Sequence, residues 1–366
     1  MRTYHVATGS VHYFETTCGE LIKGADELTK KVEEIDASRN LSPSPQNFVK
    51  SKKLVVRNNH YSCLTPSALS RLDGLLEDLT EGDAMIIIHN PPSAVAHSLR
   101  RQEGYGQIEM HSYAQERQTI HDIDDISGKI SQMQANIIGQ DQAIREIVGS
   151  LLYLSKSTRK QPFVIMLYGG SSLGKTETVH TIADSFFDGE IIEKHLSMFE
   201  TNAYADYFFG SNPNTRSLGF ELDERSSNLL FLDEVDKCQP IFHTAFYSLF
   251  DSNVYRDLTY DVDTSGLLIF LTCNYASEHD ILKNLGEPIF YRIDKFIPYR
   301  TFTPSAILEI TQREVRQQID QMNLDLDYDA VYHMSAHRIM GSGENGRTIR
   351  NKVRTVIESM IMAQKL

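Results

Sequence analysis

Cysteine and long apolar runs are both scarce in this chain of 366 residues, and each shortage argues against a class of protein. The four cysteines are scattered without a C-x-x-C pair, which disfavours a zinc knuckle and a disulfide framework and favours a reducing, cytoplasmic location. No apolar stretch approaches the roughly 18 residues that cross a bilayer, and the first ten residues lack a signal-peptide pattern. We therefore expect no membrane association.

Basic residues are outnumbered by acidic ones, which gives a formal net charge of -13. This balance argues against broad, non-specific nucleic-acid binding, although it is compatible with a local basic patch. A hydrophobic content of 41% and a charged content of 23% are ordinary for a globular protein. The length predicts two or three domains of roughly 100–200 residues each.

The most informative motif is a glycine-rich run that fits G-x-x-x-x-G-K-[ST], the phosphate-binding loop of nucleoside triphosphatases. An apolar stretch precedes it and a helix-like stretch follows it, which is the strand–loop–helix setting that phosphate binding by backbone N–H groups requires. We expect Lys175 to reach the β- and γ-phosphates and the Thr176 hydroxyl to bind Mg²⁺. The predicted loop consists of Gly169, Gly170, Ser171, Ser172, Leu173, Gly174, Lys175 and Thr176.

Two acidic residues follow another apolar run, 229–232. A buried strand that ends in Asp233 and Glu234 places both carboxylates at the carboxyl end of a parallel sheet, where ligands bind in such folds. We expect Asp233 to hold Mg²⁺, directly or through water, and Glu234 to polarise the attacking water as general base. A third apolar run leads to Asn274, which either orients that water or only starts the following turn.

Four segments follow from the pattern along the chain. Residues 1–118 contain strand-like stretches at 4–14 and 48–56 and a helix-like stretch at 67–79, which predict a small α+β domain that recognises a partner or substrate. Residues 119–135 have apolar residues spaced by three or four, which predicts a connecting helix. From residue 136 strands alternate with helices, which predicts an α/β ATPase subdomain with a parallel sheet over 136–300. A helical lid subdomain follows over 301–366, and its first long helix is capped by Thr303-Pro304.

These motifs resemble the AAA+ ATPase module of the Clp/heat-shock unfoldase and disaggregase clade, over roughly residues 136–366. The segment 136–144 resembles the clade's opening V-x-G-Q-x-x-A-I box, and 232–237 resembles its L-D-E-I-[ED]-K motif. Two arginine motifs of the clade, P-E-F-x-x-R-[IL]-D and G-A-R-x-[LI]-[KR], are similar to 288–294 and 345–350.

The resemblance implies a P-loop AAA+ fold, ATP hydrolysis with Mg²⁺, and a homo-oligomeric ring of six subunits. It implies that Ile137 and Ile138 surround the adenine. Arg292 would be a finger that reaches the nucleotide of a neighbouring subunit, and Arg347 would contact the γ-phosphate within its own subunit. Both arginines would stabilise charge on the γ-phosphate oxygens in the transition state.

One departure from the clade concerns the loop that grips a threaded polypeptide, of the type G-x-P-P-G-[YF]-[VI]-G. The corresponding stretch 210–219 keeps the flanking glycines and a proline but lacks the aromatic residue. Phe208, Phe209 and Phe220 lie beside it and either replace that aromatic or belong to the core. The tripeptide at 218–220 resembles a peptidase-docking motif, but it precedes Asp233 in the chain, so we expect no peptidase docking.

Three functions remain open. The leading interpretation is a Clp-like ATPase that remodels or unfolds a protein partner. The alternative is an ATP-gated oligomeric switch or scaffold that assembles with an effector, as in bacterial defence, without threading a polypeptide. A nucleic-acid-directed loader is the third, and the acidic charge balance counts against it.

Overall fold

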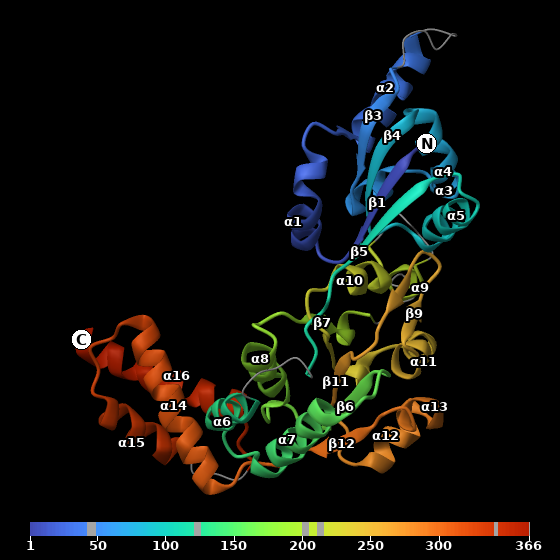
Figure 1. The fold of residues 1–366 in the computed structure, drawn as a ribbon. Helices are drawn as coiled ribbons and strands as arrows, with labels where there is room; N and C mark the ends of the chain where they lie inside the picture. Colours follow the sequence, from blue (N-terminus) through green and yellow to red (C-terminus); the bar gives the residue numbers. More distant parts are fainter. Residues whose placement is uncertain (42–48, 121–125, 200–204, 211–215, 340–342, 366) are drawn as a thin grey trace. The chain divides into compact units, whose positions relative to one another are not determined.

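The computed structural model describes the chain except for residues 42–48, 121–125, 200–204, 211–215, 340–342 and 366. The chain forms two compact units, which Figure 1 draws in sequence colours. Unit 1 contains residues 1–118, 201–228 and 241–265, and unit 2 contains residues 119–200, 229–240 and 266–366. Among the described residues, we find no helix with the length and apolar character that a bilayer span demands.

Unit 2 is built on a parallel sheet. Its strands are β6 (Phe163–Tyr168), β7 (Ile192–His195), β8 (Leu229–Asp233), β11 (Leu268–Cys273) and β12 (Lys295–Pro298). They lie in the order β12-β6-β11-β8-β7, and each described pairing is parallel. Every residue of β6, β8 and β11 is buried, as expected of central strands whose two faces are both covered.

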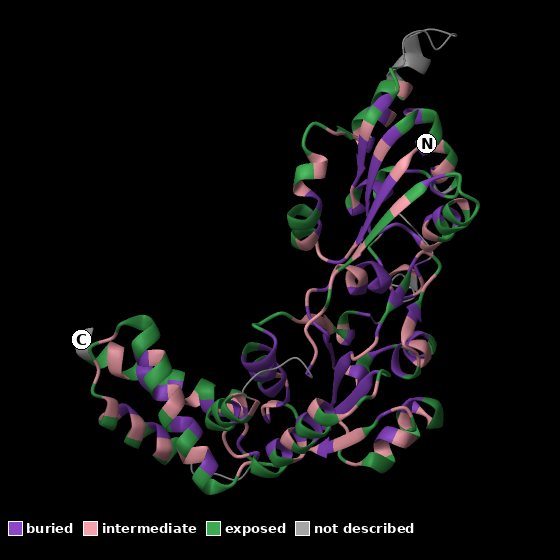
Figure 2. Cartoon of the chain, in the orientation of Figure 1, coloured by how far each residue is buried: buried purple, intermediate pink, exposed green. Residues whose placement is uncertain are grey.

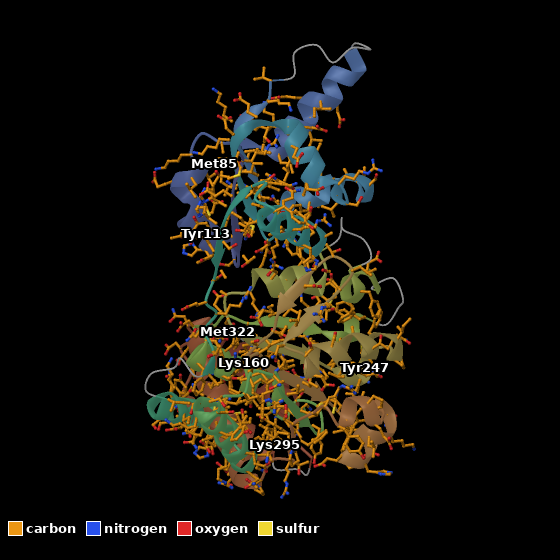
Figure 3. The ribbon with its side chains drawn as sticks, turned by 45° about the vertical axis from the view of Figure 1, so that its right-hand side comes forward. Met85, Tyr113, Lys160, Tyr247, Lys295 and Met322 are labelled. Carbon is orange, nitrogen blue, oxygen red and sulfur yellow. The ribbon has the colours of Figure 1, made fainter. Side chains whose placement is uncertain are left out.

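Helices cover this sheet and hold its edge strand. They are α6 (Ile126–Asn136), α7 (Asp141–Lys156), α8 (Lys175–Phe186), α12 (Glu278–Leu285) and α13 (Glu287–Phe290). Residues of α6, α7 and α8 share one core cluster with alternate residues of the strands, among them Ile147, Ile182 and Phe231. Lys295, labelled in Figure 3, lies 3.3 Å from Glu146 (Nζ to Oε2) and so ties β12 to α7.

The C-terminal part of unit 2 is a group of three helices with a core of its own. They are α14 (Pro304–Met322), α15 (Tyr328–Ile339) and α16 (Gly346–Lys365), drawn in orange to red in Figure 1. Thr303 caps α14 by accepting a hydrogen bond from the Ala306 N–H, and Pro304 occupies its first turn. The predicted α/β fold with a helical C-terminal region is therefore confirmed.

The N-terminal part of unit 1 also contains a parallel sheet. Its strands β1 (Thr3–Thr8), β2 (Asp26–Glu27), β3 (Ser51–Val56), β4 (Thr80–His89) and β5 (Glu109–Ala114) lie in the order β2-β3-β4-β1-β5. The helices are α1 (Val11–Ile22), α2 (Leu28–Leu41), α3 (Pro66–Leu69), α4 (Leu72–Leu79) and α5 (Ser93–Gly104).

Both faces of this sheet carry buried clusters, which Figure 2 shows as purple strands between helices. Phe14 and Cys18 of α1 pack with Ala7 and Ile87 on one face, where the labelled Met85 and Tyr113 of Figure 3 join them. The block is therefore an alternating α/β structure and not the α+β domain that the sequence predicts. The sequence predicts one strand over 4–14. In the structure Ser10 accepts a hydrogen bond from the Tyr13 N–H and caps α1, so the strand ends before it.

Two segments from the ATPase sequence range complete unit 1. They form α9 (Ala205–Phe209), α10 (Leu218–Glu224), α11 (His243–Asp251), β9 (Val254–Arg256) and β10 (Asp261–Asp263). Arg117 donates to the Asp223 carbonyl at 2.9 Å and lies 3.6 Å from the Asp223 carboxylate. Asn58 donates to Glu224 at 3.1 Å. The block 1–118 is thus part of a larger unit, and the domain boundaries expected from the sequence stay predictions.

His89 is a buried titratable group at the end of β4, with 2% of its surface exposed. Its Nε2 lies 2.9 Å from the Gly9 carbonyl oxygen, and its ring stacks on Phe14 with a 4.5 Å separation of centroids. Burial lowers the pKa of His89 to about 4, against an ordinary value of 6.5.

We expect this histidine to make unit 1 sensitive to acid. The pKa of His89 is depressed in the folded state. The contribution of His89 to the stability of unit 1 is therefore fully present above pH 6.5 and is lost as pH falls to about 4. A shift of that size corresponds to about 3 kcal/mol. His89→Gln does not ionise and keeps an amide donor for Gly9, so it should flatten part of the pH dependence of urea unfolding midpoints between pH 7 and pH 4. His12→Gln, at an exposed position, is the control, and identical pH slopes for wild type and His89→Gln would contradict the assignment.

Candidate functional site

The glycine-rich loop joins β6 to α8, and two of its glycines have backbone angles that other residues rarely adopt. Gly169 has φ +133°, and a Cβ atom there would lie 2.3 Å from the carbonyl oxygen of Tyr299, so only glycine fits. Gly174 has φ +97° and caps the N-terminus of α8. The loop therefore turns sharply and delivers Lys175 to the first turn of the helix.

Lys175 is buried, with 7% of its surface exposed, and its ammonium group bridges two parts of the site. It donates to the carbonyl oxygens of Gly169 and Gly170 at 2.6 and 2.7 Å and to Asn274 Oδ1 at 3.2 Å. Burial lowers the pKa of Lys175, and nearby Asp236, Asp233 and Glu234 act in the opposite direction. The cation is thus held between the glycine-rich loop and the end of β11.

Strand order brings the acidic residues to the same place. β11 lies between β6 and β8, with Cys273 opposite Tyr168 and Leu271 opposite Leu232. Because parallel strands end at the same edge of a sheet, the segments that follow β6, β8 and β11 converge.

Thr272 connects the two acidic residues. Its hydroxyl donates to Asp233 Oδ1 and accepts from the Glu234 N–H at 2.9 Å. Glu234 has φ 57° and ψ 48°, the left-handed region, which costs a non-glycine residue roughly 1–2 kcal/mol. Backbone strain of this kind concentrates at functional sites, and here it turns the chain sharply after the buried Asp233.

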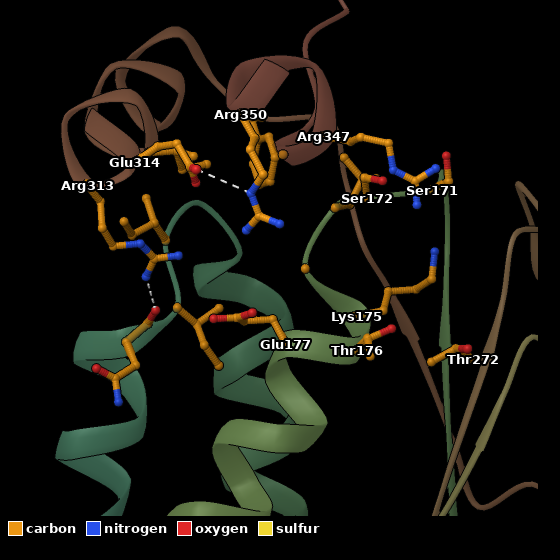
Figure 4. Close-up of a pocket in the computed structure, with 18 of the residues that line it drawn as sticks. Ser171, Ser172, Lys175, Thr176, Glu177, Thr272, Arg313, Glu314, Arg347 and Arg350 are labelled. Carbon is orange, nitrogen blue, oxygen red and sulfur yellow. Dashed lines mark hydrogen bonds and ion pairs between the residues drawn. The ribbon is translucent and has the colours of Figure 1, made fainter. Parts of the chain in front are cut away.

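These residues line a cavity of about 390 Å³ between the sheet and the helical group of unit 2. Ile137, Ile138, Phe302 and Ile310 give it an apolar part. In Figure 4, Lys175 and Thr272 lie at one end, whereas Arg313 and Glu314 lie at the other. The cavity thus pairs an end that carries Lys175 and the acidic residues with a part that offers apolar side chains beside Arg313 and Glu314, and a nucleotide needs such polar and apolar surroundings for its phosphates and its base.

Hydrogen bonds connect the glycine-rich loop to the helical group and to the opening box. The Gly346 N–H, at the start of α16, donates to the Ser172 carbonyl at 2.9 Å. The buried Gln140 side chain donates to the carbonyl oxygens of Leu173 and Arg300 at 3.2 and 2.8 Å. Arg347 follows Gly346 and lies beside Ser171 in Figure 4. The loop conformation is therefore linked to the position of α16.

The structure brings most of the predicted site residues together, and their roles stay predictions. Gly169 and Gly170 are absent from the lining but accept the hydrogen bonds of Lys175. Arg292 is not among the lining residues either; it donates to the Pro288 carbonyl at 2.5 Å beside α13. The predicted residues that line the cavity are Ile137, Ile138, Ser171, Ser172, Leu173, Gly174, Lys175, Thr176, Asp233, Glu234, Asn274 and Arg347.

Several residues of this cavity were not predicted from the sequence. Thr272 stands two positions before Asn274, and its place in an apolar run gave no signal of a polar role. Arg350 follows Arg347 by three positions on one helix and is therefore its neighbour in space. Arg350 Nε lies 3.2 Å from Glu314 Oε1, which lines the same cavity. The places of Thr272 and Arg350 in the cavity become evident only from the arrangement of the strands and helices.

The residues considered for gripping a polypeptide have a mixed outcome. Positions 211–215 lie outside the described residues. Phe208 and Phe220 are 1% and 6% exposed, which supports the alternative that they belong to the core. Phe209 is partly exposed, and its carbonyl accepts a hydrogen bond from the N–H of Leu258, which is 79% exposed.

The fold and the cavity together define a P-loop α/β module with a helical lid, the architecture of an AAA+ ATPase. No family model matches the sequence. ClpV1, an AAA+ ATPase of Pseudomonas aeruginosa, is 29% identical over 175 residues, which cover 44% of this chain and 19% of that protein. The chaperone ClpB of Yersinia enterocolitica is 27% identical over 165 residues, covering 42% and 18%. Heat shock protein 100 of Trypanosoma brucei brucei is 23% identical over 270 residues, covering 69% and 29%.

A solved structure gives the same answer for the fold. Closed-state Hsp104 with ATPγS and FITC-casein matches with a TM-score of 0.54 and 12% identity, over 99% of this chain and 87% of that chain. The chain is therefore related to the Clp/Hsp100 AAA+ ATPases over part of its length. It spans 29% or less of the length of the three curated relatives.

Proposed function

We propose that this chain binds and hydrolyses ATP with Mg²⁺ in the cavity of unit 2 and uses the cycle to remodel a protein partner. The observation that carries the proposal is the convergence on one cavity of Lys175, Asn274, the Asp233–Glu234 pair and Arg347. These are the cation, the water-positioning amide, the acidic pair and the lid arginine that phosphoryl transfer to water uses.

The donor set fits the metal and the triphosphate. Mg²⁺ prefers oxygen ligands, and the Thr176 hydroxyl and the Asp233 carboxylate both line the cavity. Bound Mg²⁺ would neutralise phosphate charge. Lys175 would exchange its carbonyl partners for phosphate oxygens, Glu234 would accept the proton of the attacking water, and Asn274 would orient that water. Ile137 and Ile138 would contact the base.

The helical lid offers a route from nucleotide to motion. Gly346 is hydrogen-bonded to the glycine-rich loop, and Arg347 follows it directly. A γ-phosphate contacted by both Lys175 and Arg347 would favour one arrangement of lid and sheet, and its loss would release that arrangement. Hydrolysis would then become a change in the angle between α16 and the sheet.

Assembly is the next part of the proposal. Arg292 lies outside the cavity of its own chain, as a residue that serves a neighbouring subunit would. The proposed assembly is a homo-oligomer, a ring of six, that acts on protein in the cytoplasm. The chaperone name of ClpB and the Hsp104 complex with casein support the action on protein. The alternative, an ATP-gated switch without threading, is favoured by the burial of Phe208 and Phe220.

The first prediction from the proposed function concerns the general base. We expect Glu234→Gln to bind ATP as wild type does but to lose at least ~100-fold in turnover, because the amide cannot accept the proton. ATP binding by calorimetry and phosphate release are the measurements, and the assembly should persist on ATP in size-exclusion chromatography. Glu309→Gln, at an exposed position of α14, is the control. Unchanged phosphate release in Glu234→Gln would refute the assignment.

A second prediction addresses the subunit interface. Arg292→Ala should hydrolyse ATP poorly, by a factor of about 10³ where an arginine finger acts. Mixing it with Glu234→Gln should restore part of the activity, because at one of the two kinds of mixed interface an intact Arg292 meets an intact Glu234. Lys283→Ala, which removes an exposed cation of α12, should need no rescue. If mixtures are no more active than the sum of their components, Arg292 does not act between subunits.

A third prediction separates a remodeller from a switch. For a remodeller, unfolded casein should stimulate ATP hydrolysis, and Phe209→Ala should reduce unfolding of a tagged substrate at least ~5-fold without changing basal hydrolysis, because one aromatic contact is worth about 1 kcal/mol. Phe209→Tyr should retain unfolding. Phe220→Ala is unsuitable because its ring is core. No response to casein, with hydrolysis that depends steeply on protein concentration, would favour the switch, and stimulation by DNA would favour the loader.

A further inference from the structure

A histidine that the proposed mechanism does not use lies against Asp233. β7 and β8 pair in parallel with His195 opposite Asp233, so the two side chains point to the same side of the sheet. His195 Nδ1 lies 3.2 Å from Asp233 Oδ2. The Asp233 side chain is 13% exposed, whereas that of His195 is 51% exposed.

The other ring nitrogen of His195 has an acidic partner of its own. Nε2 lies 3.5 Å from Glu193 Oε1, two residues earlier on the same face of β7. Glu193 Oε2 in turn lies 3.1 Å from Nε2 of His180 on α8, the helix that begins with Lys175. A continuous polar chain therefore runs from α8 through β7 to the end of β8.

The second oxygen of Asp233 is also engaged. Thr272 of β11 donates to Oδ1 and accepts from the Glu234 N–H. Histidine on one side and threonine on the other thus fix the rotation of the Asp233 carboxylate. Each carboxylate oxygen keeps a lone pair that is directed elsewhere.

We propose that His195 is a positioning residue, which orients the Asp233 carboxylate for the magnesium ion of the nucleotide complex. This inference rests on the proposed function. Groups that hydrogen-bond to a metal-binding side chain fix its orientation, and removing them typically weakens metal affinity or activity 10–100-fold. His195 acts through Asp233 and is not itself a catalytic residue.

Direct metal binding by His195 is the competing interpretation. Ligand atoms of Glu193, His195 and Asp233 do lie within 4.8 Å of one another. However, the two ring nitrogens face different carboxylates, Nδ1 toward Asp233 and Nε2 toward Glu193. The ring therefore bridges two acids and does not join them around a common centre.

The experiment compares three variants of the full chain in Mg²⁺ titrations of ATP hydrolysis. His195→Ala should raise the Mg²⁺ concentration for half-maximal activity about 10-fold, while nucleotide affinity measured in EDTA stays within 2-fold of wild type. His195→Asn should restore the wild-type midpoint, because its amide nitrogen can occupy the position of Nδ1. His195→Gln, whose amide reaches the position of Nε2 instead, should behave like alanine. His279→Asn, at an exposed position of α12, is the control.

The outcomes distinguish this inference from the proposed function. A wild-type chain that neither binds nor hydrolyses ATP refutes the proposed function. If the wild-type chain hydrolyses ATP and all three His195 variants keep the wild-type Mg²⁺ midpoint, the positioning role alone is overturned. Equal shifts for His195→Asn and His195→Ala also overturn it, and tight Zn²⁺ binding that both variants abolish would establish direct metal binding instead.

Discussion

The insertion of β11 between β6 and β8 is the constraint on which the rest of the site depends. It places Asn274 within 3.2 Å of Lys175 and allows Thr272 to bond both Asp233 and Glu234. A register slip of one residue would turn Thr272 to the other face and break these contacts. The same register buries every residue of the two neighbouring strands. The register of β11 therefore determines both the hydrophobic packing of the sheet and the alignment of the polar groups, and a change in one would change the other.

The glycine-rich loop is held from three directions, and each contact comes from a different part of unit 2. The Tyr299 carbonyl faces Gly169, Gln140 donates to Leu173, and Gly346 donates to Ser172. The last contact is the only one of these three that involves the helical lid. It joins the backbone segments that carry Lys175 and Arg347, so a ligand that displaces the loop must break this hydrogen bond or displace the start of α16 with it.

Unit 2 was largely predictable from the sequence, whereas unit 1 was not. Strands such as β6 and β8 are unbroken apolar runs next to recognisable motifs, and Thr303-Pro304 is a strong helix start, so periodicity and capping sufficed. The apolar pattern over 4–14 predicts one strand, although the structure has β1 followed by α1. The only local signal that separates the two elements is the cap residue Ser10. His195 and Arg350 carry no local signal: their roles arise from strand register and helix placement, which depend on contacts distant in sequence. Arg292 was proposed only on the resemblance of 288–294 to the clade's arginine motif.

Unit 1 is built from three separate segments of the chain, and this bears on how residues 1–118 take part in function. Segments 201–228 and 241–265 pack with residues 1–118 through the Arg117–Asp223 and Asn58–Glu224 contacts. Burial raises the pKa of Asp223 to about 6, so the Arg117 partner matters for keeping this acid ionised at neutral pH. In sequence, these two segments lie between β7 and β8 and between β8 and β11, and Asn228 is followed directly by the first residue of β8. A partner that moved residues 1–118 would therefore act on chain that is covalently continuous with β7, β8 and β11, the strands that carry His195, Asp233 and Thr272. This continuity gives the N-terminal block a short covalent path to the site, which a domain joined only by residues 119–135 would lack.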